Sequence, residues 1–315
     1  MSEPLELLRT LLDLLESGAA CALCTVVNSR GSTPQTAGAM LLVCPNGDTQ
    51  GTIGGGCVEA EVRRQALAML PSRDSRLLSF ALDHDDSGHD GLICGGRLDV
   101  AVACLADAAQ AAPIREAIDR IRRQERACVP LRVRHEGKTV EFRLNVEPMP
   151  TLLIAGAGHV GAALAKLAAG LDFRVVVLDD RSDLLNRQRL PAPIEAAAGT
   201  IEKVLREWPI DANTYVVVVT RGHAHDQRAL HAVIDSPAKY LGMIGSRRKI
   251  GTVFDDLEHL GVDRARLQQV RTPIGLKIGA VTVPEIAVSI AAELIQVRRA
   301  EGHRAVEGPF EVGAK

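Results

Sequence analysis

A glycine-rich turn between two apolar runs constrains the fold of this chain more than any other feature. Residues 152–155 are apolar and lead into G-x-G-x-x-G at residues 156–161, and a helix-forming segment follows. A second apolar run, residues 175–178, ends in Asp179, close to the roughly 20-residue spacing of dinucleotide-binding units. The order strand, glycine turn, helix, strand and acid predicts a Rossmann-like α/β unit with a parallel sheet.

Each glycine of this turn has a distinct expected role. Gly156 permits the tight turn, Gly158 lets the backbone approach a pyrophosphate, and Gly161 brings the helix against the strand. The helix N-terminus, where His159 lies, offers unpaired N–H groups to a phosphate, and Asp179 is placed to accept a ribose hydroxyl. We therefore predict all five as cofactor-binding residues. The alternative is that the glycines serve packing alone.

The length of the chain favours two domains. With 315 residues it exceeds one average domain, and Pro148 and Pro150 lie in a stretch without hydrophobic periodicity. We predict a smaller N-terminal α+β domain over residues 1–148 and a Rossmann-like domain over residues 149–315.

Composition argues against several classes of function. The net charge is −2 and aromatic residues make up 3%, which is unlike a nucleic-acid-binding surface with stacking platforms. The N-terminus does not resemble a signal peptide, and no apolar run approaches the roughly 18 residues of a membrane span. We expect a cytoplasmic protein that binds neither nucleic acid nor membrane, with its seven cysteines reduced.

Two further apolar runs lie in the C-terminal half, at residues 215–220 and 240–244. Each is followed by a polar and basic segment. Ligands of open α/β sheets gather at the carboxyl ends of the strands, so these segments should meet the glycine turn at one edge. There they would supply six further cofactor-binding residues, namely Arg221, His223, His225, Ser246, Arg247 and Arg248, with Lys249 adding to the positive charge. The two histidines lack an identified third ligand, so we favour hydrogen bonding over metal binding and predict no metal site.

Two cysteines of the N-terminal half stand beside glycines. Cys57 follows three consecutive glycines at the start of an expected helix, where the thiol pKa would be lowered, and Cys94 precedes Gly95. Both are candidate site residues, against the alternative that each packs as a small hydrophobe. Cys21 and Cys24 are spaced as C-x-x-C, but residues three apart in a strand face opposite sides, so we interpret them as buried core residues.

Seven motifs, in order along nearly the whole chain, resemble those of the XdhC/CoxI family of xanthine dehydrogenase accessory proteins. They occupy residues 31–34, 51–59, 94–96, 156–161, 220–226, 240–249 and 273–280. Gln35 stands where an arginine commonly follows the proline, so a phosphate contact there is not expected. Val281 and Val283 alter the usual approach to the last helix, although Thr282 and Glu285 still allow its cap.

The resemblance implies a molybdenum cofactor chaperone rather than an enzyme. Such proteins hold the cofactor, a molybdopterin, while a cysteine desulfurase helps to replace an oxo ligand by sulfido. They then deliver it to xanthine dehydrogenase or a related molybdenum hydroxylase. In that role Cys57 and Cys94 would lie near the metal as the reactive thiols, and the glycine turn with Arg247 and Arg248 would take the phosphate. A homodimer is left open, as is the mononucleotide or dinucleotide form of the cofactor.

Two other functions remain at this point. Asp179 beside the glycine turn also suits NAD or another nucleotide, and an NAD-dependent oxidoreductase would need His223 or His225 for proton transfer. The second of these functions is that of a nucleotide-sensing regulatory module.

Overall fold

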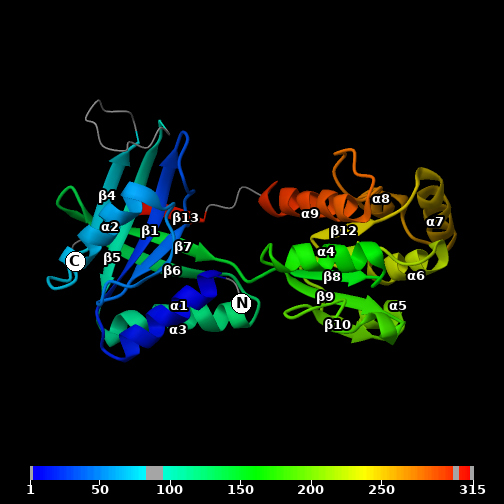
Figure 1. Ribbon diagram of the computed structural model, residues 1–315, viewed down its shortest axis with the longest axis horizontal. Helices are drawn as coiled ribbons and strands as arrows, with labels where there is room; N and C mark the ends of the chain where they lie inside the picture. Colours follow the sequence, from blue (N-terminus) through cyan, green and yellow to red (C-terminus); the bar gives the residue numbers. More distant parts are fainter. Residues whose placement is uncertain (1–2, 83–94, 301–304, 313–315) are drawn as a thin grey trace. The chain divides into compact units, whose positions relative to one another are not determined.

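The computed structural model describes residues 3–82, 95–300 and 305–312, and the chain forms two compact units (Figure 1). The first unit runs to Pro148 and the second begins at Met149. Strand β13 (Val306–Glu311) returns to the first unit, where it pairs antiparallel with β7 (Lys138–Val146). The sequence alone predicts this segment as part of the Rossmann-like domain, because nothing in its composition reveals its pairing partner.

The first unit is built on a mixed sheet with the strand order β13-β7-β6-β4-β5-β1-β2-β3. Helices α1 and α3 cover one face, and α2 packs against the other face over β5, β1 and β2. The remaining elements are α1 (Glu3–Glu16), β1 (Cys21–Arg30), β2 (Met40–Val43), β3 (Thr49–Gly51), α2 (Gly56–Met69), β4 (Arg76–Ala81), β5 (Arg97–Leu105), α3 (Ala108–Arg122) and β6 (Ala127–His135).

Strand β1 confirms the interpretation of the C-x-x-C pair. Cys21 packs in the core beneath α1 and α3, whereas Cys24 packs in the core beneath α2, as period-two alternation requires. Burial raises the pKa of the Cys21 thiol to about 12 and also raises that of Cys24. Both thiols are therefore protonated and unreactive at neutral pH.

The second unit is a Rossmann-like domain, as predicted. Its five strands are all parallel in the order β10-β9-β8-β11-β12, with α4 and α9 on one face and α5, α6, α7 and α8 on the other. The strands are β8 (Thr151–Ala155), β9 (Arg174–Asp179), β10 (Glu195–Ala198), β11 (Thr214–Val218) and β12 (Tyr240–Met243). The helices are α4 (His159–Ala169), the 3-10 turn η1 (Ser182–Leu184), α5 (Ile201–Glu207), α6 (His223–Val233), α7 (Arg247–His259), α8 (Arg264–Leu267) and α9 (Val283–Ala300).

The two central strands explain why the sequence forms this sheet. Every residue of β8 and β11 is buried, as expected for parallel strands with helices on both faces. Helix α9 begins with the predicted cap, because the Glu285 carboxylate accepts hydrogen bonds from the N–H groups of Val281 and Thr282 at 2.8 and 2.9 Å. In the described part of the chain no helix is both long and apolar enough to cross a membrane.

The strand order fixes where a ligand can enter. From β8 the chain moves outward to β9 and β10, then returns to β11 on the other side of β8. The sheet therefore has its topological switch point between β8 and β11, and ligands of such sheets bind outside the carboxyl ends of the strands at this point. We call this side of the second unit the carboxyl edge.

Candidate functional site

The glycine turn after β8 lies at the switch point of the carboxyl edge. A Cβ on Gly156, which has φ 121°, would lie 2.5 Å from the carbonyl oxygen of Val219, and one on Gly161 would lie 1.9 Å from the carbonyl oxygen of Gly156. Neither position can hold a side chain. A Cβ on Gly158 would meet nothing within 4 Å. The outer two glycines are therefore needed for packing, while the middle one leaves the backbone open to an approaching group.

The Asp179 carboxylate holds this turn in place. It accepts hydrogen bonds from the N–H of Ala157 at 2.7 Å, from the N–H of Arg181 at 3.0 Å and from the Arg181 guanidinium at 2.9 and 3.0 Å. Burial alone would raise the pKa of Asp179, but these donors outweigh it and lower the pKa to about 2. Asp179 is 1% exposed and cannot accept a ribose hydroxyl without releasing a donor. The arrangement thus removes the main reason for an NAD site.

The segment after β11 reaches across the end of β8. Arg221 pairs with Asp180, which follows β9, at 2.8 Å, and its Nε donates to Nε2 of His225 at 3.2 Å. The guanidinium of Arg228 lies 3.1 Å from Nδ1 of the same ring. A neutral imidazole has a single acceptor nitrogen, so only one arginine at a time can donate to it. His223 is exposed at the start of α6, with no hydrogen-bond partner among the described residues.

Two arginines stand open at the entrance of α7. Ser246 caps this helix, and its hydroxyl accepts a hydrogen bond from the N–H of Lys249 at 3.3 Å. Arg247 and Arg248 are exposed, and neither guanidinium has a partner in the described part of the chain. A helix N-terminus with two unneutralised guanidinium groups is a favourable site for a phosphate.

Lys249 does not belong to this open charge, contrary to the sequence-based expectation. Its ammonium forms an ion pair with Asp226, which is 0% exposed and whose other carboxylate oxygen accepts from the N–H and hydroxyl of Thr220 at 3.1 and 2.5 Å. This ion pair, in which only Asp226 is fully buried, instead ties the start of α7 to α6. The sequence could not reveal it, because Asp226 carries no mark that distinguishes it from a solvated acid.

A hollow of about 540 Å³ beside α4 is lined by two basic side chains, Lys166 and Arg189, that the sequence motifs do not indicate. The guanidinium of Arg189 donates to the carbonyl oxygen of Ala157 in the glycine turn at 3.1 Å, while its Nε is buried without a hydrogen-bond partner. The sequence feature that could have indicated Arg189 is the presence of three arginines, at positions 181, 187 and 189, in the segment after β9. The lining, all from the described residues, holds no carboxylate: His159, Ala162, Ala163, Lys166, Asn186, Gln188 and Arg189.

The charges along the carboxyl edge are unevenly neutralised. The carboxylates of Asp179, Asp180 and Asp226 are each paired with a cation. Cations without a carboxylate partner in the described chain remain at the α7 entrance and in the hollow beside α4. Because these three carboxylates are paired, they oppose the binding of an anion only weakly. The remaining cations can therefore attract a phosphate-bearing ligand.

The first unit presents Cys57 at the N-terminus of α2. The thiol residue is exposed and follows residues 54–56, three glycines with φ 121°, 69° and 63°. Glu59 folds back over this loop, where its carboxylate accepts from the hydroxyl of Thr52 at 2.6 Å and from two loop N–H groups at 3.0 and 3.1 Å. Burial opposes these hydrogen bonds, yet they lower the pKa of Glu59. The loop is thereby held in the shape that presents Cys57.

Three sequence motifs of the first unit meet around residues 31–34. A Cβ on Gly96 would lie 2.3 Å from the carbonyl oxygen of Ser32, and one on Gly54 would lie 2.7 Å from the Pro34 side chain. The Cys57 loop and the Gly95-Gly96 segment therefore both pack against the same turn. Cys94 itself lies outside the described residues.

The described residues include no ready-made metal site. Within residues 3–82, 95–300 and 305–312, no three His, Cys, Asp or Glu side chains are grouped so that they could hold an ion. The open groups described at the carboxyl edge include the N–H groups of the glycine turn and the guanidinium groups of Arg247 and Arg248, which suit an anion.

Sequence comparisons find several curated relatives of this chain. The curated relatives include the uncharacterized protein YqeB of Escherichia coli, 30% identical over 90% of this chain, although the chain spans only 45% of that relative. A probable xanthine dehydrogenase subunit of Bacillus subtilis is 27% identical over 92% of this chain and 97% of its own length. The molybdenum cofactor insertion chaperone PaoD of Escherichia coli is 26% identical over 93% of this chain and 88% of its own length.

A solved structure supports the fold. The crystal structure of a xanthine dehydrogenase from Bacillus halodurans matches with a TM-score of 0.81 over 96% of this chain and 97% of that one, at 22% identity. Two family models also match, the XdhC Rossmann domain over residues 152–294 and the XdhC and CoxI family over residues 14–81. The chain therefore belongs to the XdhC and CoxI family, and its second unit is an XdhC Rossmann domain.

Proposed function

We propose that this protein is a molybdenum cofactor chaperone that holds the cofactor for sulfuration and delivers it to xanthine dehydrogenase or a related molybdenum hydroxylase. The observation that carries the proposal is the carboxyl edge, where an open glycine turn follows β8 at the switch point and two unneutralised guanidinium groups follow β12. The names of two relatives, a molybdenum cofactor insertion chaperone and a probable xanthine dehydrogenase component, support the choice of ligand.

The phosphate of the pterin is the group that this edge suits best. Gly158 leaves room for an oxygen to approach the first N–H groups of α4, and Arg247 and Arg248 stand at the start of α7. Phosphate oxygens accept charge-assisted hydrogen bonds from both kinds of donor. The paired carboxylates of Asp179 and Asp226 do not repel the ligand, since each is neutralised by its own cation.

Cys57 is the thiol proposed to act on the molybdenum centre during sulfuration. A thiolate is a suitable neighbour for a soft metal centre, and Cys57 is an exposed thiol residue at a helix N-terminus. Cys94 is proposed as a second thiol on the basis of the sequence alone. In this proposal a cysteine desulfurase supplies the sulfur that replaces an oxo ligand, while the chaperone shields the cofactor from solvent.

The test is to identify the small molecules that leave the protein after it is purified from its own cell and denatured. Mass spectrometry should find the pterin, and the double variant Arg247→Gln/Arg248→Gln should bind it about a hundredfold more weakly and so retain much less of it, because two charge-assisted hydrogen bonds are lost. Arg264→Gln is the matched control, since Arg264 is exposed on α8 and pairs with Glu258. Release of a nicotinamide nucleotide in place of the pterin would reject the proposal, as would equal retention by the double variant and the control.

A further inference from the structure

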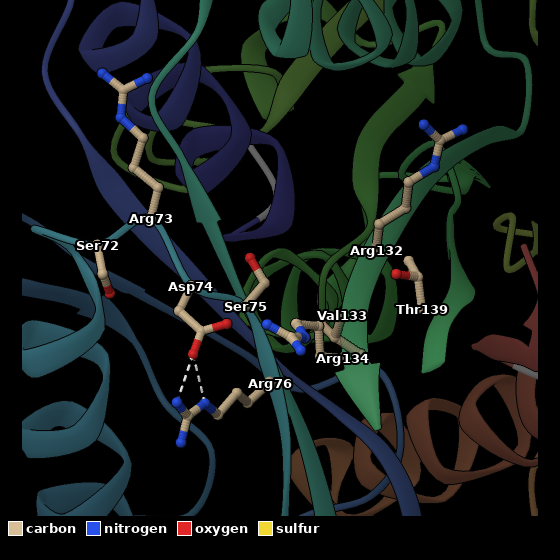
Figure 2. Close-up of a pocket in the computed structure, with 9 residues that line it drawn as sticks. All are labelled: Ser72, Arg73, Asp74, Ser75, Arg76, Arg132, Val133, Arg134 and Thr139. Carbon is tan, nitrogen blue, oxygen red and sulfur yellow. Dashed lines mark hydrogen bonds and ion pairs between the residues drawn. The ribbon is translucent and has the colours of Figure 1, made fainter. Parts of the chain in front are cut away.

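A second hollow, of about 580 Å³, lies wholly within the first unit and is lined by four arginines. Arg73 comes from the turn after α2, Arg76 begins β4, and Arg132 and Arg134 lie on the exposed face of β6 (Figure 2). The remaining lining residues are Ser72, Asp74, Ser75, Val133 and Thr139. None of them belongs to the motifs or the site described above.

The strand pairing at this hollow sets two like charges opposite each other. Strands β4 and β6 pair in parallel at a single position, Arg76 with Arg134, and the N–H of Arg134 donates to the carbonyl oxygen of Ser75 at 2.7 Å. Like charges directly opposite each other on neighbouring strands destabilise a sheet. Asp74 neutralises only Arg76, through a pair at 2.6 Å that Figure 2 shows. An anion bound beside Arg134 would remove the remaining repulsion.

Arg73 and Arg132 of the hollow form only weak ion pairs within the protein. Arg73 pairs with Asp107, and Arg132 pairs with Glu141, but these arginine side chains are 60% and 67% exposed. Ion pairs at such exposed positions contribute little and exchange readily. Arg134 has no carboxylate partner in the described part of the chain, and Figure 2 shows its guanidinium extending towards the strand that begins after Ser75.

Hydroxyl groups complete the set of donors. The Ser75 oxygen accepts a hydrogen bond from the N–H of Cys104 at 3.0 Å, so its own hydrogen remains available to donate. Thr139 is exposed on the neighbouring strand β7. The lining contains no aromatic side chain and hence no surface on which a nucleobase could stack.

We propose that this hollow binds a small molecule with at least two anionic groups, phosphate or carboxylate, and no aromatic ring. Arginine forks pair bidentately with both kinds of group, and the volume lies within the range of metabolite sites. The inference does not depend on the proposed function, because the hollow lies in the first unit and the glycine turn in the second.

The test uses the full-length protein and an arginine-specific dicarbonyl reagent, with modified peptides quantified by mass spectrometry. Pyrophosphate at constant ionic strength should slow the modification of Arg132 and Arg134, whereas Arg64 should be unaffected. Arg64 is a matched control, since it is 68% exposed in the same unit and pairs with Glu61. An unchanged rate at Arg134 in millimolar pyrophosphate and in millimolar citrate would overturn the proposal. Protection by pyrophosphate alone assigns a phosphorylated ligand, and protection by citrate alone assigns a polycarboxylate.

A variant makes the test specific to the hollow. In Arg134→Gln, half-protection of Arg132 should need about tenfold more pyrophosphate, because one charge-assisted contact is lost. Arg64→Gln should leave the protection unchanged, and circular dichroism checks that both variants fold. Equal protection of Arg132 in the two variants would contradict the proposal. Modification of Arg247 and Arg248 is read in the same experiment, so failure here is distinct from failure at the carboxyl edge.

Discussion

At the scale of single residues, the glycine turn shows how one motif divides its work between packing and access. Gly161 is pressed against the Gly156 carbonyl, whereas Gly158 faces open space at φ −63°. These roles follow from the G-x-G-x-x-G spacing, because the backbone alone dictates them. The partners of Asp179 could not be predicted from the sequence, because an acid at the end of β9 can accept a hydrogen bond equally well from a ribose or from Arg181.

This division predicts opposite phenotypes for two alanine substitutions. Gly158→Ala should change the free energy of unfolding by about 1 kcal/mol or less, yet reduce cofactor retention, because its methyl group occupies the space a phosphate would approach. Gly161→Ala should destabilise by several kcal/mol, about 3 or more, because its Cβ would collide with backbone. Urea unfolding and released pterin measure the two effects. Equal retention by wild type and Gly158→Ala would argue against phosphate binding at the turn.

Asp179 should give stability a particular dependence on pH. Its pKa is about 2 in the folded protein against 3.8 ordinarily, so its contribution is fully present above about pH 4 and is lost as the pH falls towards 2. The shift corresponds to about 2 kcal/mol. Urea unfolding at several pH values should show this loss in the wild type and a flatter profile in Asp179→Asn. Identical slopes in the two proteins would contradict the assignment.

At the scale of elements, the parallel strands bring distant segments to one edge. The ends of β8, β11 and β12 were predictable as neighbours, because apolar runs that alternate with helices form a parallel sheet with the loops of each kind on one side. What could not be predicted was which cations stay open. Lys249 lies next to Arg248 in the sequence, but the first turn of α7 directs its side chain to Asp226.

The Lys249–Asp226 pair should matter for stability rather than for ligand charge. Lys249→Met should destabilise the second unit by about 3–5 kcal/mol, because it leaves a buried carboxylate without its counter-charge. The double variant Asp226→Asn/Lys249→Met should recover part of this loss. Thermal unfolding checks both, with Arg247→Gln as the exposed neighbour expected to stay within about 0.5 kcal/mol of wild type. A harmless Lys249→Met would show that the pair is not needed.

At the scale of the whole molecule, the protein consists of two units with separate hydrophobic cores. The boundary near residue 148 could be read from two prolines, whereas the return of β13 to the first sheet could not, because its six residues pair with β7 through backbone groups that any sequence possesses. The eight-stranded order of that sheet was likewise beyond reach, since β4 and β6 meet at a single residue pair.

Separate cores predict separate responses to truncation. Removal of residues 305–315 should lower the unfolding temperature of the first unit, because β7 loses its pairing partner and Val306 leaves the core. The second unit should be unaffected. Differential scanning calorimetry, with transitions assigned by hydrogen exchange, measures both. A parallel shift of the two transitions would mean that the units unfold together.

The position of β13 also sets the order in which the nascent polypeptide can mature on the ribosome. Residues 149–300 are synthesised before the strand that completes the first sheet, so the first sheet lacks its edge strand until the Rossmann domain has been translated. The first unit, although it begins the chain, is therefore the later of the two units to have all its strands synthesised.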